Sequence, residues 1–348
     1  MNAPNKSIVI HAARDLRIED HAVPQPGPGQ VLLQMQAGGI CGSDLHYFNH
    51  GGFGPIQLKE PMVLGHEVSG KITALGQGVA GLVVGQLVAV SPSRPCQNCE
   101  YCLRGQQNHC LNMRFYGSAM PFPHIQGAFQ QVLVADASQC VPADGLTAGQ
   151  AAMAEPLAVC LHAVRQAGDL VGKTVLVTGC GPIGCLSILA ARRAGAAQII
   201  ATDLSDYTLA MARACGADVV LNTGSDVEAL KPYQVGKGQV DVHLECSGAA
   251  AALASGVTVL RPGGILVQLG LGGDMTVPMQ AMTAKEITLK GSFRFHPEFA
   301  TAVQLMQAGL IKVDPLITHS FDITEAQTAF ETAGDRSAAM KVQLVFAG

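Results

Sequence analysis

Short apolar segments separated by polar turns dominate the first part of the chain. Strand-like alternation is visible at residues 31–37, 70–75 and 87–90, with glycine-rich turns between them. The proline- and glycine-rich stretch at 22–29 cannot lie within a helix or a central strand. The pattern therefore predicts a mostly β domain over residues 1–155.

The pattern changes after residue 155. Continuous apolar runs, typical of parallel strands with both faces covered, alternate with segments of helical period. The strands are expected at 174–178, 198–202, 219–221, 240–245 and 264–269, and the helices at 157–166, 183–194 and 207–215. This alternation predicts an α/β domain with a doubly wound parallel sheet over residues 156–294. Two further helices (298–308, 325–332) and a strand (341–346) follow, and we expect residues 295–348 to rejoin the first domain.

Composition narrows the function classes. The 348 residues are 48% hydrophobic and 14% charged, with a formal net charge of −4 and no dense Lys/Arg block. We therefore expect neither a nucleic acid nor a membrane as the main partner. No apolar run reaches the roughly 18 residues of a membrane span. The N-terminus lacks the basic start and apolar centre of a signal peptide, so cytoplasmic residence with reduced cysteines is expected.

A glycine fingerprint follows the strand at 174–178. Its sequence is Gly179-Cys180-Gly181-Pro182-Ile183-Gly184, and it opens a predicted helix. The first glycine permits a tight turn, the second admits a pyrophosphate, and the third lets helix and strand pack closely. Asp203 lies 19 residues beyond Gly184, at the end of the next strand. Its carboxylate suits ribose hydroxyls and would repel a 2′-phosphate, which favours NAD over NADP.

Four cysteines form a compact metal-binding pattern. Cys96, Cys99, Cys102 and Cys110 have the spacing C-x2-C-x2-C-x7-C. Four thiolates this close can enclose a tetrahedral zinc ion and leave no open position, so we assign the site a structural role. An iron–sulfur cluster usually has a shorter third spacing and a following proline, whereas Leu111 follows here.

A second set of candidate ligands is dispersed along the chain. Cys41 lies in Cys-Gly-Ser-Asp, His66 and Glu67 follow Gly65, and Glu155 precedes a proline. A catalytic zinc has three protein ligands and one open position. Four candidates imply that one carboxylate, Glu67 or Glu155, is a direct ligand and that the other supports the site or exchanges with it.

Together these motifs resemble the zinc-containing medium-chain alcohol dehydrogenases over nearly the whole chain. Within that family the sequence is similar to the branch of sorbitol dehydrogenases and L-idonate 5-dehydrogenases, through Cys41–Tyr47, Ala154–Leu157, Gly117–Met120 with Phe122–His124, Lys290–Phe295 and the last residues, Ala339–Phe346. The resemblance implies a GroES-like catalytic domain interrupted by a Rossmann domain, one catalytic and one structural zinc, NAD, and a homodimer or homotetramer. Some members have a third cysteine ligand where this chain has Glu155.

The resemblance also implies a reaction. Zinc would make a substrate hydroxyl acidic, so that hydride can pass to NAD⁺. Ser43 and His46 could conduct the released proton to solvent, and Arg294 could bind a substrate carboxylate as a bidentate guanidinium. We expect oxidation of a secondary alcohol on a linear sugar acid, L-idonate to 5-keto-D-gluconate.

The sequence alone leaves three other functions open. A polyol such as sorbitol or xylitol is the alternative substrate, because polyol dehydrogenases have an arginine in the context of Arg294. A non-catalytic nucleotide-binding protein is a second alternative. A nucleic-acid-binding zinc module is the weakest alternative, because the cysteine cluster has no flanking basic residues.

Overall fold

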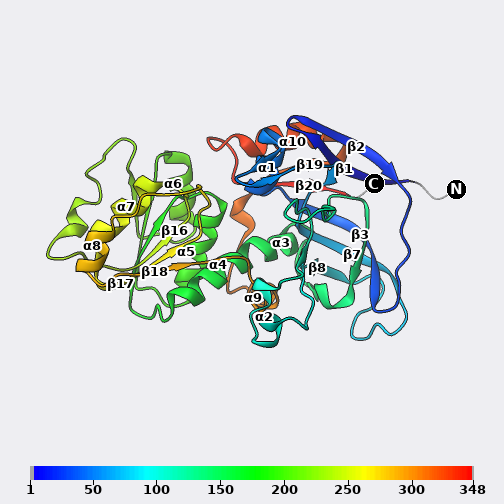
Figure 1. Cartoon of the computed structure of the whole chain (residues 1–348), viewed down its shortest axis with the longest axis horizontal. Coiled ribbons are helices and arrows are strands. Elements are labelled where there is room, and N and C mark those ends of the chain that lie inside the picture. Colours follow the sequence, from blue (N-terminus) through cyan, green and yellow to red (C-terminus); the bar gives the residue numbers. More distant parts are fainter. Residues whose placement is uncertain (1–3, 347–348) are drawn as a thin grey trace.

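The computed structural model describes residues 4–346, and they form two lobes (Figure 1). One lobe is built mainly from strands and contains both ends of the described chain. The other is a layered α/β lobe formed by the middle of the chain. Helices α4 and α9 lie where the lobes meet.

The β lobe is centred on a seven-stranded sheet. Its order is β12-β8-β7-β3-β20-β19, and β11 also pairs with β3. In chain order the strands are β3 (Gln30–Gly39), β7 (Glu67–Leu75), β8 (Leu87–Val90), β11 (Val132–Asp136), β12 (Cys140–Pro142), β19 (Ile317–Asp322) and β20 (Lys341–Val345). Strand β20 from the end of the chain thus pairs with β3 from its beginning, with Gln343 opposite Gly39.

Smaller elements complete this lobe. Three small sheets contain β1 (Asn5–Ala12), β2 (Asp15–His21) and β6 (Met62–Val63); β4 (Gly52–Phe53) and β5 (Ile56–Gln57); and β9 (Ser93–Arg94) and β10 (Arg114–Phe115). Its helices include α1 (Gly42–His50), α2 (Glu100–Leu103), α3 (Ala148–Ala152) and α10 (Ala326–Gly334). Short 3-10 helices occur at Gln107–His109, Ala137–Gln139 and Ile323–Glu325.

The α/β lobe contains a six-stranded sheet in which every strand pair is parallel. Its order is β15 (Val219–Asn222), β14 (Gln198–Asp203), β13 (Thr174–Thr178), β16 (Val240–Glu245), β17 (Leu260–Gln268) and β18 (Thr288–Gly291). The chain runs outward from β13 in one direction and then resumes at β16 on its other side. The crevice for a ligand is therefore expected at the carboxyl ends of β13 and β16.

Helices pack on this sheet and connect it to the β lobe. They are α4 (Ala154–Ala167), α5 (Pro182–Arg193), α6 (Asp206–Ala214), α7 (Ala250–Val259), α8 (Met279–Ala284) and α9 (Glu298–Gln307), with 3-10 turns at Lys231–Gln234 and Asp314–Leu316. Residues of α4, α5 and α9 share one apolar core with β13, and that core extends to Ala89 and Ala143 of the β lobe. Among residues 4–346, no helix is both long and apolar enough to cross a membrane.

The predicted parallel sheet is confirmed, and several strands match their predicted bounds. Strand β17 begins at Leu260, four residues before the expected start, and α4 begins at Ala154, so that Glu155 lies within its first turn. Helices α1, α2, α3, α7 and α8 and strand β18 were not predicted. The division of the chain at residues 155 and 294 stays a prediction, because α9 packs on the α/β lobe while β19 and β20 join the β lobe.

A buried carboxylate on α9 links that helix to α4. Glu298 is 3% exposed, and its Oε1 lies 3.1 Å from His162 Nδ1 and 2.9 Å from Arg165 Nη1. Burial alone would raise the pKa of Glu298, but hydrogen bonds from His162 and from the backbone N–H of His296 outweigh burial and lower it to about 2.

The variant Glu298→Gln should therefore lower the free energy of unfolding, by about 1–3 kcal/mol at pH 7. A carboxyl with a lowered pKa stabilises the fold above its unfolded value of 4.5, and that contribution disappears as the pH falls toward 2. The difference from the parent protein should shrink below pH 4.5 in urea titrations at several pH values. Glu228→Gln, on an exposed surface pair, is the control and should change little. A difference that does not depend on pH would contradict this role.

Candidate active site

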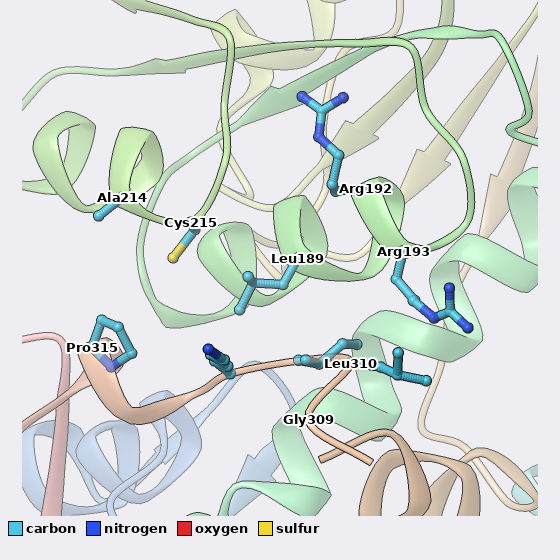
Figure 2. Close-up of a pocket in the computed structure, with 10 residues that line it drawn as sticks. Leu189, Arg192, Arg193, Ala214, Cys215, Gly309, Leu310 and Pro315 are labelled. Carbon is cyan, nitrogen blue, oxygen red and sulfur yellow. The ribbon is translucent and has the colours of Figure 1, made fainter. Parts of the chain in front are cut away.

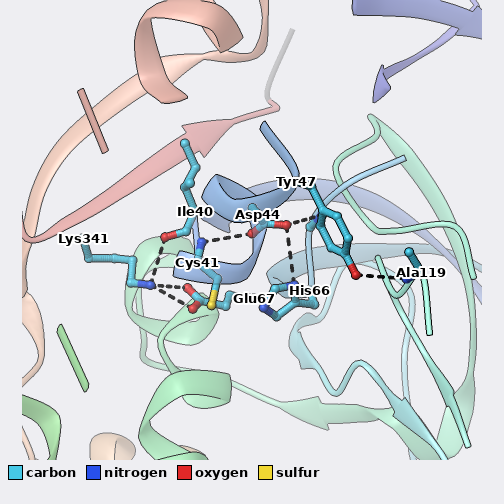
Figure 3. Close-up of polar contacts among 9 residues, drawn as sticks. Ile40, Cys41, Asp44, Tyr47, His66, Glu67, Ala119 and Lys341 are labelled. Carbon is cyan, nitrogen blue, oxygen red and sulfur yellow. Dashed lines mark hydrogen bonds and ion pairs between the residues drawn. The ribbon is translucent and has the colours of Figure 1, made fainter. Parts of the chain in front are cut away.

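Three potential zinc ligands meet in the β lobe. Cys41 precedes α1, His66 precedes β7, and Glu67 is the first residue of β7 (Figure 3). One donor atom from each lies within 4.8 Å of the others. The turn before His66 requires glycine, because Gly65 has φ of +94° and an added Cβ would lie 2.1 Å from the Phe129 ring.

The carboxylate of Glu67 is held by a buried lysine. Lys341 Nζ lies 2.7 Å from Oε2 and 2.8 Å from Oε1, and it also donates to the Ile40 carbonyl at 3.1 Å. Both side chains are at most 3% exposed. Gly39 faces Glu67 across the strands, and a Cβ there would lie 2.2 Å from Oε2. Glycine at position 39 therefore makes room for the buried ion pair.

Asp44 supports the other two candidate ligands. It is fully buried, accepts the backbone N–H of Cys41 at 3.0 Å and that of Gly65 at 3.2 Å, and lies 3.7 Å from His66 Nδ1. Since Nδ1 faces Asp44, Nε2 is the ring nitrogen left for a metal. A carboxylate behind a histidine ligand is a common support of zinc sites.

This donor set fits zinc. Ligands at 2.0–2.3 Å from a tetrahedral ion lie about 3.3–3.8 Å apart, and the observed limit of 4.8 Å allows that with small movements. His66 Nδ1 is buried and has no hydrogen bond among the described residues, and the carboxylate of Asp44 at 3.7 Å is the acceptor it would reach after a small movement.

Glu155 lies near this cluster without belonging to it. It is 6% exposed, in the first turn of α4. Burial raises the pKa of Glu155, the neighbouring His66 opposes that rise, and the Glu67 carboxylate adds to it. The sequence left Glu67 and Glu155 as equal candidates, but in the structure Glu67 is the one within 4.8 Å of both Cys41 and His66.

The four cysteines meet as a second cluster. Their sulfur atoms lie within 4.8 Å of one another, and the backbone N–H of Cys96 points at Cys110 Sγ at 3.1 Å. Four thiolates at this separation fit a closed tetrahedral zinc site. The segment that contains the four cysteines, residues 96–110, is called the cysteine lobe below. It contacts the chain after β18, because Asn108 Nδ2 donates to the Phe293 carbonyl at 3.1 Å and the His109 ring stacks on Phe293.

Arg294 lies close to the first cluster. Its guanidinium is 4.6 Å from the ring centre of Phe115, and that ring lies 5.6 Å from the ring of His66. The guanidinium also lies 4.9 Å from the ring centre of Phe293. Burial lowers the pKa of Arg294, and Glu155 opposes that shift. Contacts with two aromatic rings position the guanidinium, and one of its nitrogens, Nη2, lies 3.4 Å from Met120 Sδ. Its other N–H groups can bind an anion.

The glycine fingerprint has the geometry of a phosphate-binding turn. Gly179 has φ of +81°, and an added Cβ at Gly184 would lie 1.8 Å from the Gly179 carbonyl oxygen. At Gly181, which caps α5, a Cβ would meet nothing within 4 Å, so the surface above it is open. Pro182 and Ile183 form the first turn of α5. Asp203 accepts the N–H of Cys180 at 2.6 Å and therefore faces the same turn.

The candidate proton relay, Ser43 and His46, is not connected by hydrogen bonds among the described residues. Ser43 and His46 both lie on α1, which begins beside Cys41. His46 is largely exposed, and its ring centre lies 5.5 Å from that of Phe53. Partial loss of hydration at the ring, together with nearby His50, lowers the pKa of His46. Within residues 4–346 no hydrogen bond joins Ser43 to His46, so this relay stays a prediction.

A cavity of about 520 Å³ lies elsewhere, between α5, α6 and the segment after α9 (Figure 2). Its lining is Leu189, Arg192, Arg193, Ala214, Cys215, Gly309, Leu310, Ile311, Lys312 and Pro315. None of these residues is a candidate ligand or part of the fingerprint. Two of them are cations at the last turn of α5, where they complement the helix dipole.

Sequence reasoning missed three residues of the site. Asp44 was visible in the Cys-Gly-Ser-Asp motif but was given no role. Lys341 had a usable signal, because it is a lone cation in an apolar strand, whereas Phe115 had none. Their positions depend on contacts between segments that are distant in the sequence.

The variant Gly39→Ala should disturb the metal cluster without removing a ligand. The added methyl would displace the Glu67 carboxylate, and changes behind zinc ligands typically cost about 10–100-fold in metal affinity. Metal analysis after dialysis against a weak chelator should find two zinc ions per chain in the parent protein and one in the variant. Gly42→Ala, where a Cβ meets nothing within 4 Å, is the matched control and should retain two. Two retained ions in Gly39→Ala would contradict the role of this glycine.

Comparisons with known proteins agree with this arrangement. Residues 27–148 match the alcohol dehydrogenase GroES-like domain, and residues 182–308 match the zinc-binding dehydrogenase family. The chain is 42% identical to L-idonate 5-dehydrogenase (NAD(P)(+)) of Escherichia coli K12, over 99% of this chain and 100% of that protein. It is 39% identical to human sorbitol dehydrogenase, over 94% of this chain and 92% of that protein.

Solved structures of dehydrogenases resemble this chain over nearly its whole length. The crystal structure of Escherichia coli L-idonate 5-dehydrogenase superposes with a TM-score of 0.95 at 41% identity, covering 99% of each chain. That of 2R,3R-butanediol dehydrogenase from Bacillus subtilis gives a TM-score of 0.87 at 29% identity, covering 98% of this chain and 99% of that one. The chain therefore belongs to the zinc-containing medium-chain alcohol dehydrogenases, in their sorbitol dehydrogenase-like branch, and uses zinc and a nicotinamide dinucleotide.

Proposed function

We propose that the protein oxidises a secondary alcohol of a linear sugar acid, converting L-idonate to 5-keto-D-gluconate. The observation that carries this proposal is the 42% identity, over the full length of both chains, to an L-idonate 5-dehydrogenase. The stacked guanidinium of Arg294 beside the metal cluster supports it, because a sugar acid has a carboxylate that a polyol lacks. Oxidation of a polyol such as sorbitol or xylitol is the second candidate, favoured by the identity to sorbitol dehydrogenases.

We assign the catalytic zinc to Cys41, His66 and Glu67, with Glu155 as a nearby carboxylate that can exchange with Glu67. The second zinc is assigned to Cys96, Cys99, Cys102 and Cys110. When bound, the catalytic metal acidifies the substrate hydroxyl and the oxidised nicotinamide accepts the hydride.

The side chains around the metal have separate tasks. Lys341 prevents Glu67 from becoming an unpaired buried charge, and Asp44 orients the His66 ring. Arg294 holds the far end of the substrate, so that its carbinol carbon has one orientation. Ser43 and His46 receive the hydroxyl proton and release it to solvent.

NAD is the proposed cofactor, bound by Gly179, Gly181, Pro182, Ile183, Gly184 and Asp203. The Asp203 carboxylate lies at the end of β14, where a ribose binds in this fold. We further propose cytoplasmic residence and a homodimer or homotetramer, as is usual for the family.

A substrate panel tests the proposed reaction. The zinc-loaded protein should reduce NAD⁺ faster with L-idonate than with sorbitol or L-threonine at matched concentrations, followed as NADH absorbance. The variant Arg294→Met should raise KM for L-idonate by about tenfold or more, because a charged hydrogen bond contributes about 1.5–3 kcal/mol, and should change KM for sorbitol less. Arg294→Lys, which retains the charge without the planar fork, should fall between.

Faster turnover of sorbitol would replace the sugar-acid proposal with a polyol dehydrogenase. Equal effects of Arg294→Met on both substrates would remove Arg294 from carboxylate binding. No NADH signal with any alcohol, in protein that holds both metals, would leave a nucleotide-binding protein without catalysis.

Cofactor preference gives a separate prediction. The variant Asp203→Asn retains the size of the side chain and removes its charge, so repulsion of a 2′-phosphate disappears. The ratio of kcat/KM for NADP⁺ to that for NAD⁺ should rise about tenfold, which corresponds to about 1.4 kcal/mol. Asp206→Asn, on an exposed position three residues later, is the control. An unchanged ratio would show that Asp203 does not select the cofactor.

A further inference from the structure

Glu245 is a buried carboxylate to which sequence reasoning gave no role. It is the last residue of β16 and is 0% exposed. Both of its carboxylate oxygens accept hydrogen bonds. The donors are Thr178 Oγ1 at 3.3 Å, Ser247 N at 2.9 Å, Ser247 Oγ, Gly248 N at 2.9 Å and Gln268 Nε2 at 2.6 Å.

No cation pairs with Glu245 among residues 4–346. The ion pairs of this lobe involve other acids, such as Asp218 and Asp241. A carboxylate buried in this way is costly unless its oxygens are fully hydrogen-bonded. The bonds are therefore a strong local constraint, and they fix the groups that donate them.

The donors come from three adjacent strand ends. Thr178 ends β13 and lies opposite Glu245 in the sheet, and Gln268 ends β17. The backbone carbonyl of Glu245 also accepts the N–H of Leu269 at 2.8 Å and that of Gly270 at 2.9 Å. Because β13 and β16 flank the point where the strand order reverses, Glu245 lies directly beneath the crevice in which this fold binds a dinucleotide.

Two loops meet above this carboxylate. Residues 246–248 follow β16 and residues 269–272 follow β17. They touch backbone to backbone, since a Cβ at Gly270 would lie 2.1 Å from Gly248 N and one at Gly272 would lie 1.7 Å from Gly248 O. Gln268 Nε2 donates to the Gly270 carbonyl at 2.9 Å as well as to Glu245, so one side chain joins the second loop to the carboxylate.

A neutral histidine completes the arrangement. His243 is fully buried, and burial lowers its pKa to about 3. Its Nε2 lies 2.8 Å from Thr178 Oγ1. With the proton on Nε2, His243 donates to Thr178 and the threonine hydroxyl donates to Glu245. The end of β13, immediately before Gly179, is thereby oriented toward the same carboxylate.

We infer that Glu245 is a positioning residue that holds loops 246–248 and 269–272 as the floor beneath the nicotinamide half of the cofactor. The inference rests on the proposed function for its cofactor. A dinucleotide crosses the sheet at the reversal of strand order, with its pyrophosphate at the start of α5. Asp203 places the adenosine ribose on the β14 side, so the other half extends over β16 and β17.

The test compares two ligands that share the adenosine half. NADH contains the nicotinamide riboside, and ADP-ribose lacks the nicotinamide ring. The variant Glu245→Gln places an N–H₂ group against backbone N–H donors and should loosen both loops. Isothermal titration calorimetry should show the Kd for NADH raised about tenfold and that for ADP-ribose changed less than about twofold.

Glu298→Gln is the matched control, because it also removes a buried carboxylate and lies outside the crevice. It should lower Tm and leave the ratio of the two Kd values unchanged. The variant Gln268→Met removes the hydrogen bonds from Gln268 to Glu245 and to the Gly270 carbonyl and retains the carboxylate with its other donors. It should move the ratio in the same direction as Glu245→Gln and by less. If Glu245→Gln does not fold, the ratio measured for Gln268→Met tests whether the hydrogen bonds of Glu245 position the two loops.

The proposed function and the role of Glu245 would fail with different results. Absence of NADH binding by the parent protein would overturn the proposed function itself. Normal NADH binding by the parent, with equal weakening of both ligands or no weakening in the variants, would overturn the role of Glu245 alone.

Discussion

A buried ion pair between Glu67 and Lys341 is the constraint on which the β lobe and its site depend. The two residues are 274 positions apart, and their charged atoms lie 2.7 Å apart where little water reaches. Loss of one partner would leave an unpaired buried charge, which costs several kcal/mol. The last strand is therefore bound to the first half of the sheet by the carboxylate that also faces the metal cluster.

Small residues make such pairing possible. Gly39 admits the Glu67 carboxylate, and Gly65 lets the chain turn toward His66 against the Phe129 ring. Glycines have the same effect in the α/β lobe, where Gly248, Gly270 and Gly272 allow two loops to touch over Glu245. In both lobes a buried carboxylate lies where side chains are absent, and its hydrogen bonds determine how loops meet. Rigid positioning of this kind is what hydride transfer between two bound molecules requires.

The two lobes contribute different parts of one site. The β lobe holds the metal cluster, and the α/β lobe holds the glycine fingerprint and Glu245. Contact between them is made by α4 and α9, and by the cysteine lobe through Asn108 and Phe293. The second cluster of thiolates thus stabilises a segment that reaches the residue next to Arg294. A structural metal bound there would take the place of the apolar core that so short a segment cannot form.

Local sequence determined the elements whose chemistry is contained in a few consecutive residues. The strands of the parallel sheet, the fingerprint with Asp203 and the four-cysteine cluster could be predicted, because their periodicity or spacing is itself the signal. Cys41, His66, Glu67 and Glu155 could be proposed as a set from their residue types and local motifs, but the two carboxylates could not be ranked. Only the tertiary structure brought Glu67 beside Cys41 and His66, placed Lys341 and Asp44 behind them, and gathered three strand ends around Glu245. Most of those contacts join residues far apart in the chain, and although a lone lysine in an apolar strand is visible in the sequence, the sequence does not say which distant carboxylate it pairs with.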